Sequence, residues 1–148
     1  MTLKNALAVC LIHTRQQVHL WRDSNTLFTH ALKVTKDNYM AYNHLGMALS
    51  KQGRLDEAIP MFQKTIRISP RYAFGYNNLA ITYAKQGNLA LAISTFKQAI
   101  QINPNQYQFY QNLCVAYQQQ GNLAEARAMY EKVLQLQKQI PRLTIMDK

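Results

Sequence analysis

The stretch YNNLAITYAKQGNLALAISTFKQAIQINP, residues 76–104, contains the pattern that decides the fold. Gly87 lies near its centre, and further glycines lie 34 residues before it and 34 residues after it. The neighbours of these glycines repeat with the same period: Tyr42, Tyr76, Tyr110; Leu45, Leu79, Leu113; Leu55, Leu89, Leu123; Ala58, Ala92, Ala126; and Phe62, Phe96, Tyr130. A fixed period of this length is typical of stacked helical repeats, which expose long grooves that bind other chains.

Each unit divides at its glycine into two predicted helices. Around Gly53, apolar residues recur at intervals of three and four, the spacing of one face of an α-helix. The glycine supplies the positive φ that ends the first helix, and Pro70 and Pro104 stop the second helices of the first two units. Pro60 lies inside a predicted second helix, where we expect it to kink the helix or delay its start.

Small residues are expected where the two helices of a unit cross. In each unit a small residue of the first helix is expected to face a small residue of the second helix. The three pairs are Gly46 and Ala58, Ala80 and Ala92, and Cys114 and Ala126. Small side chains let the helices approach closely, and the aromatic residues fill the space beside the contact. Cys114 is then a packed thiol, and together with Cys10 it does not indicate a disulfide framework.

The pattern resembles the tetratricopeptide repeat family, whose unit is a helix-turn-helix of about 34 residues. The second unit matches its characteristic places with Tyr76, Leu79, Ala80, Tyr83, Ala92, Phe96, Ala99 and Pro104. The resemblance covers residues 39–140 and implies an all-α, right-handed superhelical solenoid of antiparallel helix pairs. The period and the Tyr–Leu–Gly/Ala–Tyr order favour this family over the RNA-binding pentatricopeptide repeats.

The resemblance also divides the chain into parts of one domain. These are residues 1–38, a degenerate N-terminal helix pair that caps the stack; 39–72, 73–106 and 107–140, three full repeats; and 141–148, a C-terminal tail. Trp21 keeps the register of the repeat within the N-terminal pair. Lys138 stands where proline is expected, so the last helix is expected to run on towards Pro141.

A second resemblance concerns the stretch from Trp21 to Tyr39. It is similar to the junction in bacterial membrane proteins of the mannosyltransferase-like type, in which transmembrane helices precede a C-terminal tetratricopeptide domain. On this interpretation the chain is the soluble docking or regulatory tail of a longer membrane glycosyltransferase.

The charge of the chain is strongly basic. Lys and Arg number 17 against 7 Asp and Glu, a formal net charge of +10, and no acidic residue lies between Ala58 and Ala124. Such a field attracts acidic partners. The basic residues are scattered and form no stripe, so no nucleic-acid partner is expected. Nucleic-acid binding through net charge is the weaker alternative, and it would show as a steep fall of affinity with salt.

The sequence contains no sign of a membrane span or of catalysis. No segment reaches the roughly 20 apolar residues that cross a bilayer, and the short apolar run Ala6–Ile12 is interpreted as part of a first helix. The segment is therefore expected to be cytoplasmic, or the soluble part of a bacterial membrane protein. Phosphate-binding, His-Glu-x-x-His and Cys-x-x-Cys motifs are missing. We expect no catalytic residue, no metal and no cofactor.

The resemblance places a ligand groove on the first helix of each repeat. Its concave face is predicted to bind an extended peptide or partner protein. The residues predicted to line it are Asn43, Met47, Lys51, Phe74, Asn77, Asn78, Ile81, Lys85, Gln108, Gln111 and Asn112. The same face also includes Met40, His44, Ser50, Ala84, Val115, Gln118 and Gln119.

The groove residues are of three kinds. The asparagines can hold a peptide backbone, because a side-chain amide offers both a donor and an acceptor. Lys51 and Lys85 can select an acidic peptide or a carboxylate, and the apolar members can form pockets. Of the places that form the carboxylate clamp of chaperone-binding members, only that of Asn78 matches. Tight binding of chaperone tails is therefore not expected.

The last repeat is expected to need a cover. Met129, Val133 and Leu136 form an apolar face that is predicted to lie partly open. Either the tail folds back over this face or a second copy of the chain covers it, because an exposed patch of this kind favours self-association.

Overall fold

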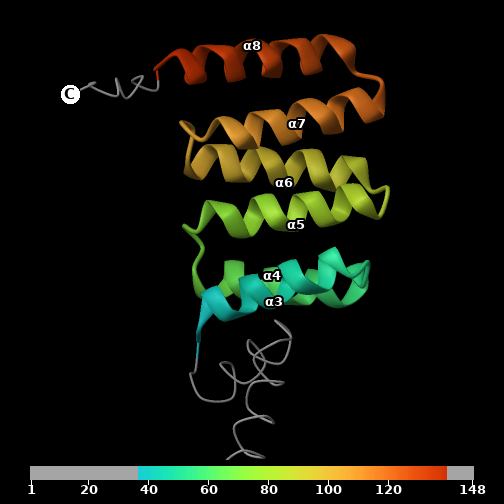
Figure 1. Cartoon of the computed structure of the whole chain (residues 1–148), viewed down its shortest axis with the longest axis vertical. Helices are drawn as coiled ribbons and strands as arrows, with labels where there is room; N and C mark the ends of the chain where they lie inside the picture. The colour runs from blue at the N-terminus through green and yellow to red at the C-terminus, as the bar shows by residue number, and fades with distance from the viewer. Residues whose placement is uncertain (1–36, 140–148) are drawn as a thin grey trace, which may run out of the picture. The chain divides into compact units, whose positions relative to one another are not determined.

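The computed structural model describes residues 37–139. In this range it contains six α-helices packed in antiparallel pairs, which confirms the predicted all-helical fold (Figure 1). The predictions for the N-terminal helix pair and the C-terminal tail concern residues outside this range. The chain divides into two compact units, Met1–Ile68 and Ser69–Lys148.

The first unit contains the pair α3 (Tyr39–Lys51) and α4 (Leu55–Ile68). Asn38 caps α3, since its Oδ1 accepts the backbone N–H of Ala41 at 3.0 Å. Helix α4 begins two residues after its turn glycine, as the other second helices do, so the predicted delay at Pro60 is wrong. A proline costs a helix one hydrogen bond, and packing of the apolar face against α3 outweighs that loss.

The crossing of α3 and α4 is as close as the small residues predict. A Cβ atom added to Gly46 would lie 2.8 Å from the Cε1 atom of Phe62, whose side chain is buried. Ala58 on α4 is buried as well. The aromatic ring therefore occupies the space that a side chain at position 46 would take.

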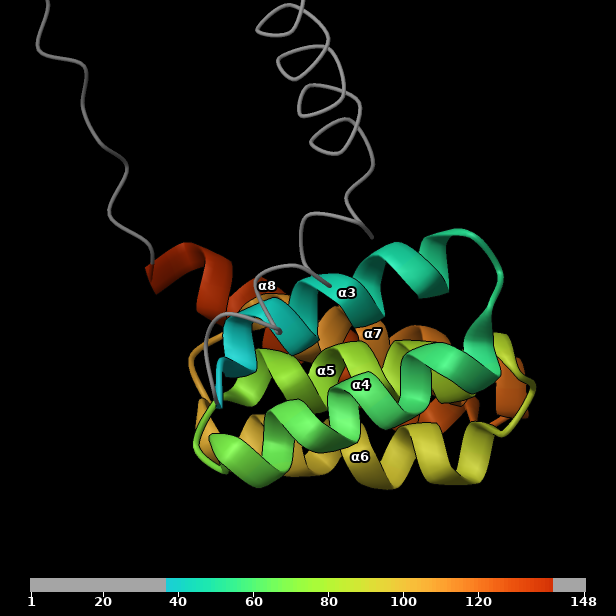
Figure 2. The same cartoon turned by 90° about the horizontal axis from the view of Figure 1, so that it is seen from below.

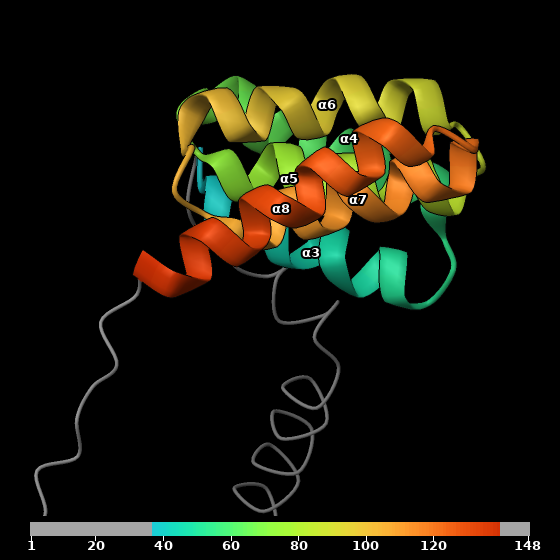
Figure 3. The ribbon, with the colours of Figure 1, turned by 90° about the horizontal axis from the view of Figure 1, so that it is seen from above.

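The second unit contains four helices, which follow one another in the stack in chain order (Figure 1). They are α5 (Ala73–Lys85), α6 (Leu89–Ile102), α7 (Tyr107–Gln120) and α8 (Leu123–Gln139). Helix α5 pairs with α6 and α7 pairs with α8, while α6 also packs on α7. Figures 2 and 3 show α5 and α7 next to each other, with α6 on one side of both.

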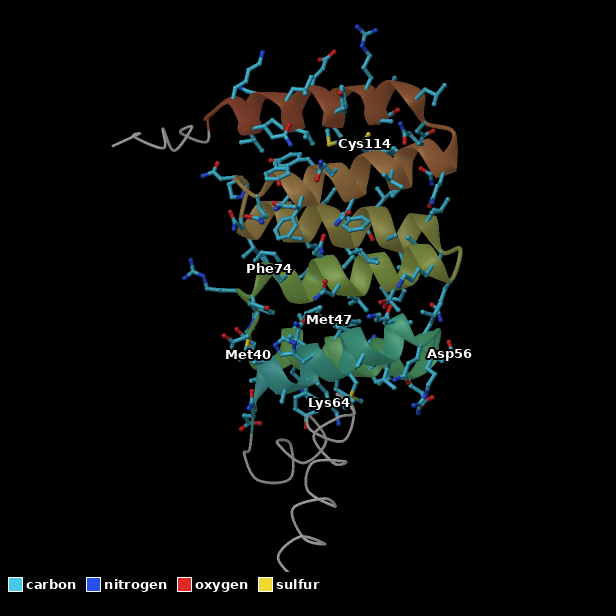
Figure 4. The ribbon with its side chains drawn as sticks, viewed as in Figure 1. Met40, Met47, Asp56, Lys64, Phe74 and Cys114 are labelled. Carbon is cyan, nitrogen blue, oxygen red and sulfur yellow. The ribbon has the colours of Figure 1, made fainter. Side chains whose placement is uncertain are left out.

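The core of the second unit is built from the predicted small and aromatic places. Its buried members are Ala80, Ala92, Ile93, Phe96, Leu113, Cys114, Ala116, Tyr117 and Ala126. Cys114 is a buried free thiol, and its Sγ donates to the carbonyl of Ala126 at 3.2 Å between α7 and α8 (Figure 4). The prediction of a packed thiol is confirmed.

The turns and helix ends also confirm the predictions. Gly53, Gly87 and Gly121 all have positive φ, at 79°, 81° and 85°. Helices α4 and α6 both end two residues before a proline, Pro70 or Pro104. Helix α8 runs on to Gln139 and has 17 residues, against 14 in α6, as the missing proline predicts.

The apolar face of α8 is more buried than predicted. Val133 and Leu136 are 3% and 5% exposed, because they pack against Tyr110 in the α7–α8 pair. The expectation that these two residues lie open is therefore wrong. The large apolar side chains that α8 does expose are Leu123, Tyr130 and Leu134.

Candidate functional site

A hollow of about 240 Å³ lies over the first helices of the second unit. We call it the α5–α7 hollow. It is lined by Ile81, Ala84 and Lys85 from α5, Phe96 from α6, and Asn112, Val115, Ala116 and Gln119 from α7. The lining therefore combines an apolar floor with one cation and two amides.

The shape of the α5–α7 hollow follows from the sizes of its side chains. Ala84 and Ala116 are small and leave room between α5 and α7. Phe96 is buried and closes the floor from α6, while Ile81 and Val115 supply apolar walls. An apolar cavity with a few polar groups at its edge is the usual form of a binding site.

Most of this lining was predicted from the sequence. Six of the eight lining residues stand on the predicted concave face: Ile81, Ala84, Lys85, Asn112, Val115 and Gln119. Phe96 and Ala116 are additions from the structure. The sequence places Phe96 beside the contact between paired helices, and no sequence signal shows that such a ring also forms the floor of a surface hollow.

The asparagines of the second unit form a chain of side-chain contacts. Nδ2 of Asn112 donates to Oδ1 of Asn77 at 2.9 Å, which links α7 to α5. Nδ2 of Asn77 in turn lies 3.5 Å from Oδ1 of Asn78. Asn77 is only 7% exposed, whereas Asn78 and Asn112 are partly exposed. The structure thus brings three predicted site residues together, with Asn77 on the inside.

Phe74 stands apart from the hollow, near the beginning of α5 (Figure 4). Its ring is 40% exposed and packs edge-on against the buried ring of Phe109, with centroids 5.2 Å apart. Gln108 and Gln111 on α7 are exposed, and neither lines the hollow. The oxygen of Gln108 accepts from the side chain of Gln106 at 2.7 Å.

In the first unit, α3 exposes two predicted apolar groove residues. Met40 and Met47 lie seven residues apart, and they are 40% and 46% exposed (Figure 4). Asn43 lies between them in the sequence but is 2% exposed, with Nδ2 at 3.5 Å from the Sδ of Met47. Little of Asn43 is left for a ligand to contact, and its ligand role stays a prediction. Lys51 is exposed at the end of α3.

The electrostatics of the hollow are set by the composition of its helices. Helices α5, α6 and α7 contain no Asp or Glu, because the chain lacks acidic residues between Ala58 and Ala124. Lys85 is the cation that lines the edge of the hollow.

A second hollow, of about 300 Å³, is lined from α6, α7 and α8. Tyr110, Leu113 and Tyr117 form its buried floor, and Lys97 lies at its edge with Nζ 5.8 Å from the ring centroid of Tyr117. None of its lining residues belongs to the predicted groove. The α5–α7 hollow is the better candidate, because it contains the polar groups of the first helices.

Two pKa shifts are resolved within residues 37–139. The hydrogen bonds from Arg54, with Nε 2.7 Å and Nη2 2.6 Å from the two carboxylate oxygens, lower the pKa of Glu57. Burial raises the pKa of the Tyr110 hydroxyl, which donates to the carbonyl of Pro104 at 3.0 Å. Both groups lie outside the α5–α7 hollow, so neither shift bears on its chemistry.

Neither a metal site nor a membrane-spanning helix is found within residues 37–139. No three His, Cys, Asp or Glu side chains come together there in a way that could hold a metal ion. None of the helices from α3 to α8 combines the length and the apolar character that a membrane crossing requires.

The burial of Asn77 was missed at the level of sequence, although a signal for it was present. Asn77 and Asn78 are adjacent, and adjacent residues of a helix point in different directions. The two side chains therefore cannot face the groove to the same extent. The sequence does not say which of the two is covered, since that depends on where α7 crosses α5.

Comparison with known proteins identifies related sequences. Two family models, both described as tetratricopeptide repeat, match residues 37–105 and 83–143. The chain is also 34% identical over 67 residues to the protein O-mannosyl-transferase Tmtc3 of Drosophila melanogaster. That match spans 43% of this chain and 7% of Tmtc3, so the chain corresponds to a small part of the transferase's length.

Several solved structures share the fold. A crystal structure of MamA is similar with a TM-score of 0.73 at 25% identity, over 85% of this chain and 74% of the other. MamA from Desulfovibrio magneticus RS-1 has a TM-score of 0.74 at 21% identity, over 88% and 73%. The first repeat domain of Spaghetti (RPAP3), bound to the HSP90 peptide SRMEEVD, has a TM-score of 0.66 at 27% identity, over 71% and 83%.

Proposed function

Because the chain belongs to the tetratricopeptide repeat family, we propose that it is a non-catalytic scaffold that binds an extended peptide or a segment of a partner protein. The observation that carries this proposal is the α5–α7 hollow, most of whose lining comes from the face of the first helices that is predicted to be concave. The apolar floor of Ile81, Val115 and Phe96 suits a side chain of the ligand. The amides of Asn112 and Gln119 suit its backbone.

The ligand is expected to differ from a chaperone tail. The repeat domain of Spaghetti binds an acidic HSP90 peptide, and it shares the fold with this chain. This chain lacks the carboxylate clamp residues except at Asn78. The net positive charge of the chain favours a ligand with negative charge. The apolar lining of the hollow favours a ligand that also carries an apolar side chain.

Selection from a random peptide library followed by titration tests this proposal. Peptides selected on the wild-type chain should lose most of their affinity when Ile81→Asp or Val115→Asp places a carboxylate in the apolar wall. Leu91→Asp is the matched control, because Leu91 is an exposed apolar residue of α6 outside the hollow. Selected peptides that bind the Ile81→Asp and Val115→Asp variants as tightly as the wild type would contradict the proposal.

A second candidate function is a docking or regulatory region of a membrane glycosyltransferase. The similarity to Tmtc3 favours it, together with the resemblance of residues 21–39 to a membrane-protein junction. The same groove would then recruit a partner to the membrane enzyme. The reading frame upstream of Met1 tests this: transmembrane segments continuous with this chain would support it, and an independent upstream gene would contradict it.

Self-association through α8 is a further part of the proposed function. By the repeat period Tyr130 takes the place of Phe96, and Leu134 takes the place of Ile100. Phe96 is 2% exposed under α7, whereas Tyr130 is 56% exposed. The outer face of α8 therefore has the character of a surface that a further helix covers in the preceding repeat. A second copy of the chain would supply such a helix.

A further inference from the structure

The contact between Asn112 and Asn77 joins the two helices that frame the α5–α7 hollow. Asn112 lines the hollow from α7, while Asn77 lies on α5 and is buried. A buried amide has to find its hydrogen-bond partners inside the protein. The 2.9 Å bond from Nδ2 of Asn112 to Oδ1 of Asn77 meets this requirement.

The donor–acceptor direction of this bond determines which atom of the Asn112 amide can contact a ligand. A side-chain amide has an oxygen on one branch and a nitrogen on the other. Turning Asn112 over would bring its oxygen against Oδ1 of Asn77, and turning Asn77 as well would bring the oxygen of Asn77 towards that of Asn78. The chain of three amides thus opposes reversal. Asn112 is left with Oδ1 as the group that can accept a hydrogen bond from a ligand.

We propose that Asn77 is a positioning residue, which holds Asn112 so that its Oδ1 accepts the backbone N–H of the ligand residue whose aliphatic side chain enters the α5–α7 hollow. This inference rests on the proposed peptide-binding function. Ile81, Val115 and Phe96 surround the place for the side chain, and Asn112 lines the same hollow. The side chain and the adjacent N–H are therefore recognised together.

A specific class of ligand follows from this arrangement. The N–H groups in the interior of a helix are used within the helix, so only an extended or irregular segment can donate one to Asn112. Proline has no N–H, and it is excluded at the residue that enters the hollow. The ligand is thus an extended or irregular segment with a non-proline aliphatic residue at this point.

Two small probes test this in the full chain by nuclear magnetic resonance. N-acetyl-L-leucine methylamide offers a leucine side chain with its N–H, and N-acetyl-N-methyl-L-leucine methylamide lacks that N–H. The first should shift the methyl signals of Ile81 and Val115 with a millimolar dissociation constant. The second should bind about three- to tenfold more weakly, the loss that one hydrogen bond represents. In the Asn112→Ala variant the two probes should bind alike.

The role of Asn77 is tested by variants with the same leucine probe. Asn77→Leu removes the acceptor, and it should weaken binding by about as much as Asn112→Ala. The double variant should be no weaker than Asn112→Ala alone, because Asn77 acts through Asn112. Asn77→Asp keeps the acceptor for Asn112 but places a second oxygen against Oδ1 of Asn78, so it is combined with Asn78→Ala. The Asn77→Asp, Asn78→Ala pair should bind like Asn78→Ala alone. Asn105→Leu, which removes an exposed amide from the α6–α7 loop, is the matched control.

Several outcomes of these experiments would contradict the proposed role of Asn77. Equal binding of the two probes to the wild type, or no methyl shift with the leucine probe, would overturn the inference. An effect of Asn77→Leu that adds to that of Asn112→Ala would also overturn it, because Asn77 would then act independently. If Asn77→Leu does not fold, weaker binding by the Asn77→Asp, Asn78→Ala pair than by Asn78→Ala alone serves as the contrary result. The proposed function fails separately, when library peptides bind independently of Ile81 and Val115.

Discussion

Asn77 and Asn78 are neighbours in the sequence, yet their side chains meet different surroundings. Asn77 is buried and accepts from Asn112, while Asn78 is partly exposed. Successive residues of an α-helix point about 100° apart, so one crossing helix can cover the first and leave the second open. At this scale a single step along the chain separates a buried amide from a partly exposed one.

The small residues at the helix crossings show the same sensitivity to single side chains. Ala80 and Ala92 are both fully buried in the core of the second unit. In the first unit the corresponding place holds Gly46, where an added Cβ atom would meet the ring of Phe62. The crossings thus leave little space for additional methyl groups.

We predict that Ala92→Val destabilises the fold by about 1–3 kcal/mol, because overpacking forces side chains off their preferred rotamers. Urea denaturation measures this change in the free energy of unfolding. Ala90→Val is the matched control, since Ala90 lies on the same helix and is exposed. Equal effects of the two substitutions would mean that helix propensity, and not packing, is responsible.

At the scale of elements, the turns between paired helices depend on the backbone of one residue. Gly53, Gly87 and Gly121 adopt the left-handed conformation, and no atom lies within 4 Å of a Cβ built on any of them. A side chain there meets no neighbour, so the requirement for glycine comes from φ alone. This is why the spacing of the glycines could be interpreted as a spacing of helix ends.

Gly87→Ala should therefore cost about 1–2 kcal/mol of stability from backbone strain without any steric clash. Gly87→Asn should cost clearly less, because asparagine tolerates the left-handed region better than alanine does. Thermal denaturation of both variants tests the comparison. If alanine and asparagine are equally destabilising, strain at φ 81° is not the reason for the glycine.

At the scale of the whole molecule, the exposed face of α8 predicts association. Size-exclusion chromatography with light scattering should find a dimer at high concentration, since Leu123, Tyr130 and Leu134 leave apolar surface open. Tyr130→Glu should shift the mass towards the monomer. Leu91→Glu, an exposed apolar position on α6, should leave the mass unchanged.

A monomeric wild-type chain at every concentration would contradict the dimer. It would leave the C-terminal tail or a partner helix as the cover of α8. The peptide-binding proposal does not depend on this result, because the α5–α7 hollow is lined by α5, α6 and α7 and not by α8.

Much of the fold could be predicted, because the features that determine it are local in the sequence. The helices, their turns and the small residues at the crossings depend on periodic spacing, on the φ of glycine and on side-chain size, all of which the sequence shows directly. The exposure of Val133 and Leu136 was predicted wrongly for a different reason. The sequence shows that both are apolar, but not that Tyr110 covers them.

The candidate site, like the fold, could be predicted only in part from the sequence. The sequence by itself determined the place of every residue on its helix through the 34-residue period, and the family resemblance predicted which of these places face a ligand. Only the tertiary structure decided that Phe96 closes the floor of the hollow and that Asn77 lies behind Asn112. A helical pattern specifies the direction in which a side chain points. Its burial and its hydrogen-bond partners depend on the helix that packs beside it.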